Sequence, residues 1–182
     1  MFTSEITEVQ VPIYALGEHI PQIHATAYVH PNAVVIGQVT VGEKATIWPT
    51  AVLRGDYGAI VIGAGTSVQD GTVVHATAEL ATIIGDRCVV GHNAHLEGCL
   101  VHDDSLIGSG SVVLQRAEVG PGSLVGAGAV VSPGTLVPPN ATALGVPATI
   151  RPNTVLPGAF RSSVERYIAL GARYRSELRR LD

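Results

Sequence analysis

The chain has 182 residues, of which 46% are hydrophobic, yet only 4% are aromatic and 14% are charged. Small aliphatic residues and 21 glycines stand where an ordinary globular core has aromatic side chains, which is typical of a narrow stacked core. The formal net charge of −4 provides no basic stripe to neutralise phosphates, so nucleic acid is excluded as the main partner.

The N-terminal segment, residues 1–22, is expected to be irregular, because Pro12 and Pro21 discourage a helix. The first five residues do not begin a signal peptide, and no apolar run along the chain is long enough to span a bilayer. We therefore expect a cytoplasmic protein that has no membrane partner.

A six-residue period begins at Ile23 and continues, with slips, to Val137. The repeats start at the apolar residues Ile23, Val29, Val35, Val41, Ile47, Leu53, Ile62, Val68, Val74, Ile84, Val90, Leu96, Ile107, Val113, Val119, Val125, Val131 and Val137. Each repeat is read as a short strand and a turn, three of which make one triangular coil. The sequence therefore predicts an all-β fold: a left-handed parallel β-helix over 23–150, with coils stacked about 4.8 Å apart.

The period slips after Leu53, between Ala76 and Thr82, and near Val101, and the extra residues are expected to form outward loops. Cys88 and Cys99 fall at small, inward positions of the repeat. Two such cysteines do not make a disulfide framework, so we expect inert thiols in the core.

A different pattern follows the β-helix, which Pro138-Pro139 and Val146-Pro147 are expected to close. Beyond Pro157-Gly158, apolar residues recur at helical spacing with arginine and glutamate between them. This pattern predicts an amphipathic α-helix over 158–182, packed along one face of the β-helix.

The repeat also predicts which polar residues lie together. Leu53, Val74 and Leu96 are one full coil apart once the loops are set aside, so the next residues, Arg54, His75 and Glu97, should form one outward column. Val68 and Val90 are likewise one coil apart. Asp70 should therefore lie beneath His92, near the corner that leads to this column.

His75 and His92 project from different faces, so one chain does not readily bring both to one metal ion. A neighbouring subunit could supply one of them, and flat faces around a threefold axis suit a homotrimer with three interfacial sites. Two imidazoles and a carboxylate are acceptable ligands for Zn²⁺ and leave a fourth position for water. Fe²⁺ and Co²⁺ accept the same donors.

Several short motifs resemble the γ-class carbonic anhydrase family of hexapeptide-repeat proteins. They are Leu53-Arg54-Gly55-Asp56, Val68-Gln69-Asp70-Gly71, Val74-His75, Val90-Gly91-His92 and Gly98-Cys99, and Gly145-Val146-Pro147-Ala148 resembles the closing motif of such repeats. The resemblance covers roughly residues 20–150. It implies zinc ligands at a trimer interface at His75 and His92, and an interface ion pair between Arg54 and Asp56.

The resemblance further implies that Gln69 and Asp70 orient the metal-bound water that attacks CO2. The chain departs from the family at the third metal ligand, a histidine in the family, because Glu97 occupies that position and a histidine lies two residues earlier, at His95. Residues 95 and 97 of a strand lie on one side, about 6.6 Å apart, so either could reach the metal. Binding by Glu97, binding by His95 and no metal binding all stay open.

Three functions follow from these readings. The first is reversible hydration of CO2 to bicarbonate by a metal-dependent lyase. The second is acyl transfer from acyl-CoA to an acyl acceptor, with a histidine as general base, on the same fold. The third is a non-catalytic trimeric metal-binding or carrier protein. The motifs favour the first function.

Overall fold

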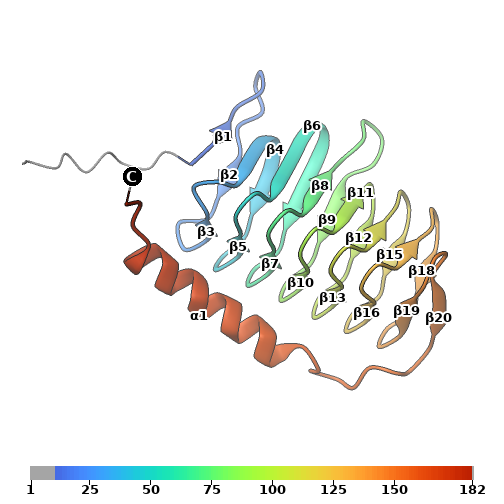
Figure 1. Cartoon of the computed structure of the whole chain (residues 1–182). Coiled ribbons are helices and arrows are strands. Elements are labelled where there is room, and N and C mark those ends of the chain that lie inside the picture. Colours follow the sequence, from blue (N-terminus) through green and yellow to red (C-terminus); the bar gives the residue numbers. More distant parts are fainter. Residues whose placement is uncertain (1–10, 182) are drawn as a thin grey trace, which may run out of the picture.

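The computed structural model describes residues 11–181 as a left-handed parallel β-helix followed by one α-helix (Figure 1). The strands are β1 (Ile13–Tyr14), β2 (Gln22–Ile23), β3 (Tyr28–Val29), β4 (Val34–Val41), β5 (Thr46–Ile47), β6 (Val52–Ile62), β7 (Ser67–Val68), β8 (Val73–His75), β9 (Thr82–Ile84), β10 (Val89–Val90), β11 (His95–Glu97), β12 (Leu100–Val101), β13 (Leu106–Ile107), β14 (Val112–Val113), β15 (Glu118–Val119), β16 (Leu124–Val125), β17 (Val130–Val131), β18 (Leu136–Val137), β19 (Thr142–Leu144) and β20 (Thr149–Arg151); the helix is α1 (Arg161–Glu177). The predicted fold class is confirmed.

The coils present three flat faces. The first face stacks the beginnings of β4 and β6 with β8, β11, β14 and β17, and the third face stacks β3, β5, β7, β10, β13, β16 and β19. The second face stacks β2 and the ends of β4 and β6 with β9, β12, β15 and β18. The first and second faces form one continuous sheet, because β6 turns the corner between them: Val52–Arg54 pairs with β8, and Ile60–Ile62 pairs with β9.

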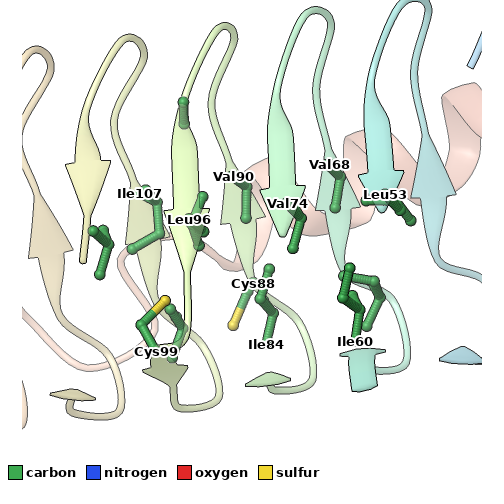
Figure 2. Close-up of a cluster of buried hydrophobic side chains, with 14 of the residues drawn as sticks. Leu53, Ile60, Val68, Val74, Ile84, Cys88, Val90, Leu96, Cys99 and Ile107 are labelled. Atoms are coloured by element: carbon green, nitrogen blue, oxygen red, sulfur yellow. The ribbon is translucent and has the colours of Figure 1, made fainter. Parts of the chain in front are cut away.

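The core is one column of small aliphatic side chains inside the coils. Figure 2 shows Leu53, Val74 and Leu96 entering it from the first face, and Val68, Val90 and Ile107 from the third. All six are fully buried, as the six-residue period requires. Successive coils are held by parallel strand pairing, with Leu53 opposite Val74 and Val74 opposite Leu96.

The two cysteines occupy inward positions of this core, as expected (Figure 2). Cys88 is fully buried and Cys99 is 3% exposed, and neither forms a disulfide. Burial raises the pKa of each thiol to about 12, which keeps it protonated at neutral pH. A protonated thiol is a poor nucleophile and a poor metal ligand, so both cysteines act as core residues.

Helix α1 lies on the third face, against β3, β5 and β7 (Figure 1). Trp48 packs edge-on against Tyr167 and Tyr174, and its indole N–H donates to Ser67 Oγ at 2.9 Å. The guanidinium of Arg175 donates to the carbonyl oxygens of Ala25 and Ala27. The helix therefore covers the third face over β3, β5 and β7 and does not lie on the first face. Among the described residues no helix is long and apolar enough to cross a membrane.

Both ends of the chain differ from the sequence expectation. β1 lies inside the segment 1–22 that was expected to be irregular and pairs with Val35 and Ile36 of β4; residues 1–10 lie outside the described residues. Strand β1 has two residues, which are too few to show a periodic pattern, so nothing in the sequence indicated this pairing. The helix spans Arg161–Glu177 rather than 158–182, and the apolar Leu178 and Leu181 beyond it are exposed.

Candidate functional site

The site is built on a column of polar residues on three stacked strands, at the edge where the first face meets the second. Arg54 of β6 pairs in register with His75 of β8, and His75 pairs with Glu97 of β11. Each of these residues follows an inward aliphatic residue, so the alternation of the strand turns it outward. The repeat thus produces the column that the sequence predicts.

The imidazole of His75 lies between two carboxylates. Its Nε2 is 3.1 Å from Asp56 Oδ1, and its Nδ1 is 3.3 Å from Glu97 Oε2. The guanidinium of Arg54 donates to the other oxygen of Asp56, so the ion pair expected between Arg54 and Asp56 forms within one chain. The side chain of His75 is only 14% exposed, and these contacts fix the orientation of its ring.

The two carboxyl groups are held in their ionised form by these partners. For Asp56, partial burial raises the pKa, but hydrogen bonds from Arg54 and His75 outweigh it and hold the pKa below its usual range. For Glu97, burial again raises the pKa, and hydrogen bonds from His75 and Gln115 lower it further than burial raises it. Both carboxylates are therefore charged at neutral pH and available to a cation.

Gln115 was missed by the sequence reasoning. It lies in the turn between β14 and β15, and its side-chain amide donates to Glu97 Oε1 at 2.5 Å. The register carried a signal for it, because Leu96 pairs with Val113, which places Glu97 opposite Leu114 and therefore close to Gln115, the next residue of that chain segment. On the other side of Glu97, His95 Nε2 lies 3.7 Å from Oε2.

A second polar pair lies at the corner between the third and first faces. His92 Nδ1 is 3.0 Å from Asp70 Oδ2, in the turns that lead into β11 and β8, so Asp70 lies beneath His92 as expected. About half of each side chain is exposed. Gln69 precedes Asp70 and is 3% exposed, so it contributes to the packing of this corner.

The donor atoms suit a divalent metal, but one chain does not complete a site. Among residues 11–181, no group of three or more histidine, cysteine, aspartate or glutamate side chains is arranged to hold a metal ion. His75 and Glu97 lie side by side, whereas His92 points from the corner with half of its surface open. An imidazole and a carboxylate are ordinary zinc ligands, so this chain offers two donors at the column and a third at the corner.

Known proteins share both sequence and fold with this chain. A family model described as "Bacterial transferase hexapeptide (six repeats)" matches residues 81–115 and 98–133. "Carnitine operon protein CaiE" of Escherichia coli K12 is 45% identical over 106 residues, which are 58% of this chain and 54% of that protein. The chain thus spans about half the length of the curated relatives it matches.

Two solved structures match over nearly their whole length. A Bacillus cereus protein named "putative acetyltransferase" is 36% identical, with a TM-score of 0.85 over 91% of this chain and 98% of that one. A hexapeptide transferase family protein from Anaplasma phagocytophilum is 34% identical, with a TM-score of 0.84 over 89% and 97%. The chain therefore belongs to the hexapeptide-repeat family of left-handed β-helix proteins, within which its motifs resemble the γ-class carbonic-anhydrase-like members.

Proposed function

We propose that this chain is a metal-dependent, γ-class carbonic-anhydrase-like lyase that hydrates CO2 reversibly to bicarbonate at the interfaces of a homotrimer. The observation that carries the proposal is the column itself. His75 and Glu97 place an imidazole nitrogen and a carboxylate oxygen 3.3 Å apart on an open flat face, with a second carboxylate, Asp56, behind the imidazole.

Glu97 is favoured over His95 as the third ligand. Glu97 pairs in register with His75 and directs Oε2 at its ring, whereas His95 pairs with Val73 and its Nε2 lies 3.7 Å from Glu97 Oε2. The metal, Zn²⁺ or alternatively Fe²⁺ or Co²⁺, would be held by His75 and Glu97 of one subunit and His92 of the partner subunit. A divalent metal held this way supplies Lewis acidity that activates water near neutral pH.

The remaining residues hold these ligands in place. Asp56 accepts from His75 Nε2, which is how a carboxylate commonly orients a metal-binding imidazole, and Arg54 fixes Asp56. Asp70 orients the ring of His92 in the same way. This role differs from the water-orienting one that the resemblance implies for Asp70.

The test is the metal content of protein purified anaerobically without chelator, together with CO2 hydration on the same samples. Wild-type protein should carry about one metal ion per subunit. Glu97→Ala should lose both metal and activity, whereas His95→Ala should keep both. Metal-free, inactive wild-type protein would overturn the proposal, and loss of metal in His95→Ala alone would reassign the third ligand.

Acyl transfer from acyl-CoA is the second candidate, and the names of the two solved relatives favour it. Acyltransferases of this fold commonly bind the acyl acceptor with a long loop. In this chain the segment between β8 and β9, residues 76–81, is too short to form such a loop. Calorimetry with acetyl-CoA separates the two candidates. Tight binding by metal-free protein would support acyl transfer, whereas bound metal without either activity would support the carrier function.

A further inference from the structure

Gln115 is fixed in the turn that follows β14. It is half-buried, and its backbone carbonyl accepts a hydrogen bond from the N–H of Gly134 on the next coil, at 2.9 Å. The backbone of Gln115 is therefore held by the stack, and its side chain reaches back by one coil toward the end of β11.

The two oxygens of Glu97 have separate partners. Oε1 accepts from the amide of Gln115 at 2.5 Å, while Oε2 faces His75 Nδ1 at 3.3 Å and His95 Nε2 at 3.7 Å. A free carboxylate can bind a metal through both oxygens, but here one oxygen is already committed. Only Oε2 is left for a cation beside His75.

The residue after Glu97 makes this contact possible. Gly98 has a φ of +59°, and a Cβ built there would lie 3.2 Å from Gln115 Cγ and 3.1 Å from Leu80 Cβ. Both distances are tighter than ordinary contacts between carbon atoms. Because Gly98 has no side chain, the aliphatic part of Gln115 can pack against the end of β11.

We propose that Gln115 is a positioning residue that makes Glu97 a one-oxygen metal ligand. The inference rests on the proposed function, because it requires metal at this column. A histidine ligand offers the metal one donor atom, whereas a glutamate can offer two. Glu97 can therefore take the place of a histidine without filling an extra coordination position only if one of its oxygens is kept from the metal. Gln115 withholds that oxygen, so the fourth position of a tetrahedral site stays free for water.

The test compares wild-type protein with Gln115→Met, which keeps the length of the side chain and removes the amide. Zinc affinity is measured by chelator competition, and the coordination number is read from the visible spectrum of the Co²⁺-loaded protein. We expect Gln115→Met to weaken zinc binding roughly 10- to 100-fold, as loss of a ligand-orienting partner does. The Co²⁺ bands should weaken as the second oxygen of Glu97 enters the coordination sphere.

The Glu97→His background separates positioning from a merely structural role. A histidine at position 97 has no second oxygen to withhold, so adding Gln115→Met there should leave zinc affinity unchanged. The matched control is Glu118→Met, which removes a similar polar contact, with His102 at 2.7 Å, on the second face. It should change neither measurement. Circular dichroism confirms that each variant is folded.

The outcomes are distinguishable. Unchanged affinity and an unchanged Co²⁺ spectrum in Gln115→Met, or an equal loss in both backgrounds, would overturn the positioning role and leave the proposed function standing. Wild-type protein that binds neither zinc nor cobalt would overturn both together. A loss confined to the background that contains Glu97 would support the role.

Discussion

The hydroxyl of Tyr28 is a buried polar group that no partner satisfies among the described residues. The side chain is 7% exposed, and its ring packs against Trp48 and Tyr174 beneath helix α1. Burial, with a smaller contribution from Tyr174, raises its pKa from 10.0 to about 12. The folded protein therefore holds the phenolic proton more tightly than the unfolded chain does.

Tyr28→Phe should stabilise the protein by about 1 kcal/mol at pH 8, because it removes an unsatisfied buried hydroxyl. The stability that wild type draws from its raised pKa is complete below pH 10 and is lost as the pH rises toward 12. The advantage of the variant should therefore grow over that range. Urea unfolding of both proteins at pH 8 and pH 11 checks this, and a constant difference would contradict it.

The docking of helix α1 depends on a glycine in its interior. A Cβ built at Gly171 would lie 2.5 Å from Thr46 Cγ2 of β5, and the indole N–H of Trp48 donates to the hydroxyl of the same threonine at 3.1 Å. This hydrogen bond and burial hold the side chain of Thr46 in place. The glycine allows the helix backbone to approach the third face closely.

Gly171→Ala should destabilise the protein by about 1–3 kcal/mol, as overpacking does, although alanine is the better helix former by about 1 kcal/mol. Thr46→Ser removes the methyl group in the way, so the double variant should regain most of the loss. Ser176→Ala, on an exposed position of the same helix, is the control. Thermal unfolding measures all four proteins, and a stabilised Gly171→Ala would show that the helix is not seated this closely.

The elements also show what the sequence could predict. The column Arg54–His75–Glu97 follows from the period alone, because each residue comes directly after a buried aliphatic residue. The contact between Gln115 and Glu97 does not, because it depends on the conformation of a turn and on the space above Gly98. The end of α1 was placed too late because Leu178 and Leu181 continue the apolar pattern of the sequence, although both side chains are exposed beyond the end of the helix.

At the scale of the whole molecule, the first face has the character of an interface. Its outward positions form a row in register, Val34, Val52, Val73, His95, Val112 and Val130, and every member is half-buried in the single chain. This row, aliphatic except for His95, runs beside the polar column. Both would be covered together if the flat faces of three chains met.

Val73→Glu should convert the proposed trimer into smaller species, because it places a charge in the middle of that row, where a packed interface would leave it unpaired. Leu136→Glu is the matched control, since Leu136 is 61% exposed on the second face. Multi-angle light scattering should give three times the chain mass for wild type and for the control. A trimeric Val73→Glu would place the interface on another face.

The stacking of coils has one consequence for how such a protein can vary. Each coil pairs only with the coil before it and the coil after it, and the column occupies consecutive coils well before the chain reaches β20. Whole coils can therefore be gained or lost beyond β18, past the coil that holds Gln115, while the coils that carry His75 and Glu97 keep their spacing. The number of coils can therefore change without any change in the distances between the residues of the column.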